Sequence, residues 1–151
     1  MNITHNNLGF NEIKMAASVV HSAIQVNLSH ELRKLSQYRI YSELSVMIDG
    51  NEYKPDVCVY PYRDIDWTHD LVKTEEIPLL AIEILSPKQM IQDVVDKVDV
   101  YLEAGVKSCW VIASFPRSIA VCEKQRVNYF SSGDLVDEQL DIRITIDDIF
   151  R

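Results

Sequence analysis

Two acidic residues lie where a carboxylate needs a particular reason to be present. Glu83 is the charged residue in the apolar run of residues 77–85, IPLLAIEIL. An ionised carboxylate that leaves water without gaining a partner costs several kcal/mol, as much as about two buried leucine side chains contribute. Glu83 must therefore meet a cation, a hydrogen-bond network or water at the strand end. A role in a functional site is favoured over an ion pair that serves the fold alone.

Asp56 begins a second strand-like segment, directly after Pro55. Aspartate is depleted in strands, and alone such a residue is more often part of a turn than a ligand. Its position matters more beside Glu83, because neighbouring strands can bring two carboxylates to one point. Mg²⁺ is commonly held by one or two carboxylates, with water completing its octahedral shell. Asp56 and Glu83 therefore predict a site for a hard divalent cation.

Lys97 lies on the helix expected after the Glu83 strand, with Asp93 one turn before it and Tyr101 one turn after it. The three side chains share one stripe of that helix. One interpretation is a surface ion pair between Asp93 and Lys97, which contributes only roughly a few tenths of a kcal/mol. The other is that the stripe overhangs the carboxylates, because the helix starts where their strand ends.

Two further residues are candidates for supporting the site. His21 projects from an apolar helical stripe, where a histidine bonded to the backbone is the commoner explanation and contact with the site is the alternative. Glu43 lies on the face of its predicted strand opposite the apolar residues. Solvent exposure explains Glu43 unless that face is covered.

The elements that position these residues follow from the spacing of apolar residues. Spacings of three and four predict an amphipathic helix over residues 11–35. Alternation predicts a strand over residues 39–48, an Asp49-Gly50 turn and a partner strand over residues 53–60, which together form a hairpin. The polar residues 61–76 predict an exposed loop.

In the second half, residues 77–85 predict a strand that is covered on both faces. A helix is expected to follow at once, capped by Ser86, with Pro87 in its first position and Gly105 at its end. Residues 109–115, 118–124, 127–130 and 140–146 predict further strands, the last of them ending the sheet. The order αβββαβ plus C-terminal strands predicts an α/β fold, a single domain over residues 1–151 with a central mixed sheet flanked by helices.

Composition narrows the classes of function. The net charge of −8 argues against a general nucleic-acid or membrane coat, but it leaves room for a local metal site. No apolar stretch has the pattern of a signal peptide or a membrane span, so we expect a cytoplasmic protein without a membrane partner. Cys58, Cys109 and Cys122 lack CxxC spacing and lie in apolar runs, which predicts buried thiols.

Together these motifs resemble the Uma-two family of restriction endonucleases, which belongs to the PD-(D/E)XK nuclease superfamily. The similarity extends from about Glu43 to Lys124. It is carried by the PD of Pro55-Asp56, the E-I-L-S-P that starts at Glu83, the D-x-x-x-K-x-x-x-Y of residues 93–101, and the A-G-V of residues 104–106 with the aromatic-containing strand at residues 109–112. The resemblance implies a restriction-endonuclease-like core.

The resemblance also implies roles for individual residues. Asp56 and Glu83 correspond to metal ligands, and Asp56, Glu83 and Lys97 to catalytic residues. Leu85 stands where the ordinary superfamily motif has its lysine, and Lys97 from the next helix would replace it, with Lys88 as the less favoured substitute. His21 and Glu43 fall near positions where members of the family often have a histidine and an acid.

The expected function is therefore hydrolysis of DNA phosphodiester bonds by an endonuclease that uses Mg²⁺ or Mn²⁺. A homodimer is plausible because cleavage of both strands needs two sites. The alternative is a catalytically inactive interaction or regulatory module on the same fold, in which Asp56, Glu83 and Lys97 form a structural charge cluster. The acidic net charge and Leu85 favour that alternative. A third option is hydrolysis of a smaller phosphorylated substrate.

Overall fold

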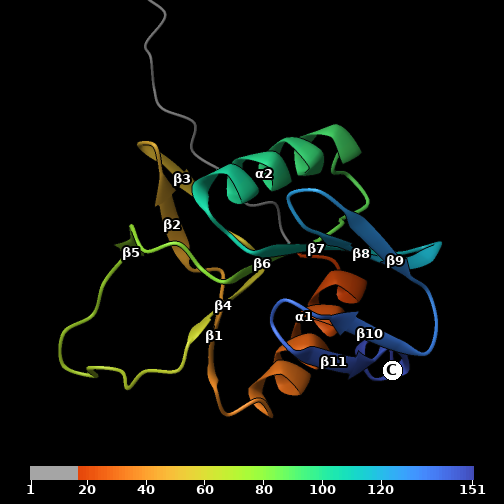
Figure 1. Ribbon diagram of the computed structural model, residues 1–151, viewed down its shortest axis with the longest axis horizontal. Helices are drawn as coiled ribbons and strands as arrows, with labels where there is room; N and C mark the ends of the chain where they lie inside the picture. Colours follow the sequence, from red (N-terminus) through yellow and green to blue (C-terminus); the bar gives the residue numbers. More distant parts are fainter. Residues whose placement is uncertain (1–16) are drawn as a thin grey trace, which may run out of the picture.

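A six-stranded mixed sheet forms the centre of the computed structural model, which describes residues 17–151 (Figure 1). In spatial order its strands are β1 (Tyr38–Ser42), β4 (Val57–Pro61), β6 (Leu80–Ile84), β7 (Ser108–Ser114), β8 (Arg117–Cys122) and β9 (Val127–Phe130). β6 and β7 run parallel, and the other neighbours run antiparallel. All five residues of β6 are buried, as its continuous apolar sequence predicts.

Two helices cover opposite faces of this sheet (Figure 1). α1 (Val19–Arg33) buries His21, Ile24, Leu28 and Leu32, and α2 (Ile91–Ala104) buries Val94, Lys97, Val98 and Tyr101. Both sets follow the spacing of three and four that places residues on one helical face. In the described part of the chain, no helix combines the length and the apolar character needed to cross a membrane.

The helix starts differ from their predictions. α1 begins at Val19, where the side chain of Ser18 accepts a hydrogen bond from the backbone N–H of His21. Residues 11–16 of the predicted helix lie outside the described residues, and Ala17 is not helical. The buried stripe runs through His21, whereas the side chain of the neighbouring Val20 is exposed.

α2 begins at Ile91, five residues after the predicted cap at Ser86. The intervening chain forms a turn in which the N–H of Gln89 donates to the carbonyl of Ser86. The turn separates Ser86 from the start of the helix, and Met90 occupies the cap position without a side-chain hydrogen bond. The predicted end is confirmed, because Gly105 adopts a left-handed conformation with φ of 109°.

The predicted strand over residues 39–48 is broken at Glu43. This residue has a left-handed φ of 53°, so the chain turns between β1 and β2 (Ser45–Ile48). The hairpin is therefore divided between two sheets, with β1 pairing with β4 and β2 pairing with β3 (Asn51–Tyr53). The predicted loop is largely exposed, and its short strand β5 (Lys73–Thr74) pairs with β2.

The C-terminal prediction is wrong in one respect. β10 (Asp134–Asp137), which the sequence reading missed, pairs with β11 (Ile142–Thr145) in a separate two-stranded sheet. The short helix α3 (Ile146–Ile149) follows. The indole N–H of Trp110 in β7 donates to the buried carboxylate of Asp137 over 2.9 Å, which ties this hairpin to the central sheet.

All the cysteines are buried thiols, as predicted. Cys109 and Cys122 lie opposite each other on β7 and β8. Burial raises the pKa of both thiols, and the nearby Cys122 and Glu83 raise that of Cys109 further. A raised pKa leaves less of the reactive thiolate at a given pH.

We therefore expect the folded protein to react with a disulfide reagent such as Ellman's reagent at pH 8 at least about 100-fold more slowly than the urea-unfolded chain. The measurement is the rate of absorbance change, with the thiols titrated after unfolding. Rapid modification of any thiol in the folded protein would contradict the prediction.

Candidate active site

Asp56 and Glu83 meet at the junction of two neighbouring strands. β4 and β6 are antiparallel, with Val57 opposite Ile82. Asp56, the residue just before β4, therefore lies beside Glu83, the residue after Ile82. Both acidic residues are only 2% exposed. The register therefore places the two acidic residues beside each other, and both are buried.

Hydrogen bonds from three elements hold Asp56. Its Oδ2 accepts from the backbone N–H of Ile84 over 2.7 Å, and its Oδ1 lies 3.2 Å from Nε2 of His21. Its main-chain carbonyl accepts from Nε2 of Gln25 over 3.0 Å and from the N–H of Glu43 over 3.2 Å. The carboxylate is thus bound both to the adjacent strand and to α1.

Glu83 receives its partners from the inner face of α2. Its Oε2 accepts from the ammonium of Lys97 over 3.3 Å, and its Oε1 accepts from the hydroxyl of Tyr101 over 2.8 Å. Lys97 is 8% exposed, and it is the only buried lysine or arginine among the described residues. The anomaly of Glu83 in an apolar strand is explained, because the next helix supplies both a cation and a hydroxyl donor.

Several other predicted residues take different places. Asp93 is exposed in the first turn of α2, whereas Lys97 is buried against Glu83, so the surface-pair interpretation is wrong. Lys88 is exposed in the turn before α2. Glu43 is exposed at the break between β1 and β2, where its main chain contacts Asp56.

Gln25 was missed by the sequence reading. It lies one turn after His21 on α1, and both side chains contact Asp56. Two polar residues spaced by four on one helix, next to an apolar stripe, are the signal that could have found it. The Nδ1 of His21 is buried and has no hydrogen-bond partner in the described structure.

The chemistry of these donors fits a hard divalent cation. The two carboxylates carry more negative charge than the Lys97 ammonium balances. A carboxylate has about four lone-pair sites on its two oxygens, so it can accept from protein donors and also bind a cation. Within residues 17–151 no group of three or more His, Cys, Asp or Glu side chains could hold a metal. Water or phosphate oxygens would therefore complete the shell, which is how proteins usually bind Mg²⁺.

The central mixed sheet with helices on both faces has a restriction-endonuclease-like fold. The same fold occurs in a crystal structure described as a putative nuclease belonging to DUF820 from Anabaena variabilis. That chain is 21% identical, with a TM-score of 0.76, and the match covers 91% of this chain and 83% of the other.

The sequence model of the Uma2 family, described as "Putative restriction endonuclease", matches residues 9–147. The chain therefore belongs to the Uma2 family, and the resemblance drawn from its motifs is confirmed. A search of curated proteins found no match.

Proposed function

We propose that this protein is a metal-dependent endonuclease that hydrolyses DNA phosphodiester bonds, with Asp56, Glu83 and Lys97 as its catalytic residues. The observation that carries the proposal is the buried pair of carboxylates on adjacent strands, with the Lys97 ammonium 3.3 Å from Glu83. Burying this much charge is costly for the fold, so the cluster is better explained by chemistry than by stability. Membership of the Uma2 family supports the same reading.

Asp56 and Glu83 would hold Mg²⁺ or Mn²⁺, which when bound acts as a Lewis acid and lowers the pKa of a bound water. The Lys97 ammonium would stabilise negative charge that develops on the phosphate in the transition state. Its burial strengthens this effect, because charges interact more strongly where water is excluded.

The remaining contacts position these three groups. Tyr101 fixes one oxygen of Glu83, and the N–H of Ile84 fixes one oxygen of Asp56. His21 and Gln25 hold Asp56 from α1 and act as positioning residues. The carboxylate orientations are thus set before a substrate arrives, which is what preorganised catalysis requires.

The net charge of −8 affects how the substrate is bound. Non-specific DNA affinity comes mainly from lysine and arginine contacts with phosphates, so we propose that this protein binds DNA weakly. Cleavage of both strands of a duplex needs two active sites, so we further propose that the enzyme acts as a homodimer.

The test is incubation of supercoiled plasmid with the purified protein at low salt, with Mg²⁺, Mn²⁺ or EDTA. We expect nicked and then linear plasmid with either metal and intact plasmid with EDTA. Single-stranded DNA, RNA and a small chromogenic phosphodiester serve as parallel substrates. Hydrolysis of the small phosphodiester alone would identify the smaller class of substrate and would contradict the DNA assignment.

The rival function is a non-catalytic module, and one observation favours it. Each carboxylate oxygen of Asp56 and Glu83 already lies within hydrogen-bonding or ion-pairing distance of a protein group, so the charge cluster has partners without a metal. If no nucleic acid is cleaved with either metal, and calorimetry detects no binding of Mg²⁺ or Mn²⁺, this alternative replaces the proposed nuclease.

A further inference from the structure

β9 forms an exposed outer edge of the central sheet. β9 pairs with β8 on one side, and no strand within residues 17–151 pairs with its other side. Proteins usually protect such edges with proline, lysine or a covering segment. The four residues of β9 include neither proline nor lysine, and Val127 and Tyr129 are 44% and 75% exposed. The edge is therefore open to another strand.

The hydrogen-bond pattern identifies the backbone groups that face outwards. The N–H of Glu123 donates to the carbonyl of Arg126 at the start of the β8–β9 hairpin. Hydrogen-bonded and non-hydrogen-bonded pairs alternate along an antiparallel ladder. The next residue, Val127, and then Tyr129 therefore direct their N–H and C=O groups away from β8.

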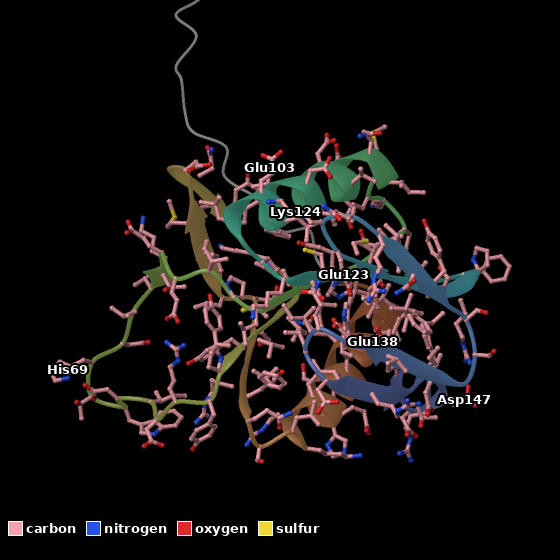
Figure 2. The ribbon with its side chains drawn as sticks, in the orientation of Figure 1. His69, Glu103, Glu123, Lys124, Glu138 and Asp147 are labelled. Atoms are coloured by element: carbon pink, nitrogen blue, oxygen red, sulfur yellow. The ribbon has the colours of Figure 1, made fainter. Side chains whose placement is uncertain are left out.

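The side chains of the same two residues line an apolar groove of about 660 Å³. α2 forms its other wall, which includes the exposed side chains of Ile91 and Val95. Glu123 and Lys124 also line this groove, and Figure 2 shows them at the turn that joins β8 to β9. The open edge and the apolar surface beside it form one continuous area, hereafter the β9 surface.

A second copy of this chain complements the β9 surface. If two copies pair antiparallel about a two-fold axis at Asn128, Val127 of each copy lies opposite Tyr129 of the other. The outward N–H and C=O groups of both residues then bond across the axis. A β-branched residue opposite an aromatic one is a favourable cross-strand pair. Asn128 faces its own counterpart, and Arg126 faces Phe130, so no like charges are opposed.

We propose that the β9 surface is a homodimer interface, in which two copies pair through β9 to form one continuous sheet. The two-fold axis is then perpendicular to the sheet, so both copies of α2 lie on the same face of the sheet. This interface rests on the open edge of β9, and its test uses no nuclease activity. Failure of the proposed dimer interface is therefore distinguishable from failure of the proposed nuclease activity.

Sedimentation equilibrium of the full chain tests the interface. We expect a species of twice the 17.4 kDa chain mass. Tyr129→Lys places a charge on the edge, and Val127→Pro removes an outward N–H while leaving the bonds to β8 in place. Each variant should raise the dimer dissociation constant by about 30-fold or more. Trp67→Lys, which changes an 87% exposed aromatic residue on the loop after β4, should leave it unchanged.

Cross-linking tests the register of the two strands. Because Asn128 faces its counterpart, the Asn128→Cys variant should form a covalent dimer under mild oxidation, whereas Trp67→Cys should not. The native thiols are buried and should not interfere. Circular dichroism confirms that each variant is folded. The interface would be overturned by a monomeric wild-type protein, or by a dimer that both folded β9 variants retain. The pairing about Asn128 would be overturned by a dimer in which the Asn128→Cys variant forms no cross-link.

Discussion

Glu83→Gln is expected to lower the rate of metal-dependent DNA cleavage by about 10³-fold or more, the effect of losing one preorganised charged group in an active site. The substitution removes a negative charge and a proposed metal ligand. It keeps an oxygen that can accept from Tyr101, whose hydroxyl lies 2.8 Å from the carboxylate in the native protein. The initial rate of plasmid nicking in Mg²⁺ measures the effect.

The matched control is Glu103→Gln. Glu103 is also a glutamate and lies on the exposed face of α2, as Figure 2 shows. The same chemical change there should leave cleavage within about two-fold of the native rate, because surface positions away from a site contribute little. Calorimetry of Mg²⁺ binding adds a readout that is independent of turnover. Cleavage that persists undiminished in Glu83→Gln and in Lys97→Ala would contradict the assignment of the site.

Lys97→Met is expected to lower the free energy of unfolding by about 3 kcal/mol, because it leaves Glu83 buried without its ammonium partner. Methionine has a similar length and keeps the packing of the lysine stem, so the loss reports the charge. Urea unfolding at pH 7, followed by circular dichroism, measures it. Lys88→Met makes the same change at an exposed position and should cost less than about 0.5 kcal/mol.

The double variant Glu83→Gln, Lys97→Met separates stability from catalysis. Removing both charges takes away the Glu83–Lys97 pair as a whole, and replacements of whole buried pairs are often neutral or stabilising. The double variant should therefore recover about 2 kcal/mol relative to Lys97→Met, yet it should remain unable to cleave DNA. A double variant that is as unstable as the sum of its single changes would show that Glu83 and Lys97 do not act as a coupled pair.

These measurements also distinguish the nuclease from a structural charge cluster. A structural cluster predicts the stability changes alone, with no metal binding and no loss of activity to measure. A nuclease predicts changes in both stability and cleavage. It also predicts that the double variant recovers stability but not cleavage. The comparison therefore depends on the double variant, in which stability returns and activity does not.

Much of the candidate site could be predicted from the sequence, because burial imposes strict chemical requirements. A glutamate inside an apolar strand needs a cation or a donor, and the structure supplies Lys97 and Tyr101. The helical spacing of these two residues already placed them on one face. The proximity of Asp56 and Glu83 was expected because neighbouring strands can align such residues.

Other features were decided by contacts between distant parts of the chain. His21 is buried on α1, where its ring reaches Asp56 just before β4, a contact that helix periodicity alone does not contain. The left-handed conformation of Glu43 accompanies a hydrogen bond from its N–H to the carbonyl of Asp56. Neither feature leaves a clear signal in the residues that flank it.

The order of the strands shows the same limit on a larger scale. The residues of β9 and β11 were recognised as strands, but only the folded chain makes β9 the sheet edge and assigns β11 to a separate hairpin with β10. The sequence by itself determined which faces are apolar and which buried charges need partners, since periodicity and desolvation act locally. The tertiary structure decided which partners meet, because that choice depends on the packing energy of elements far apart in the chain.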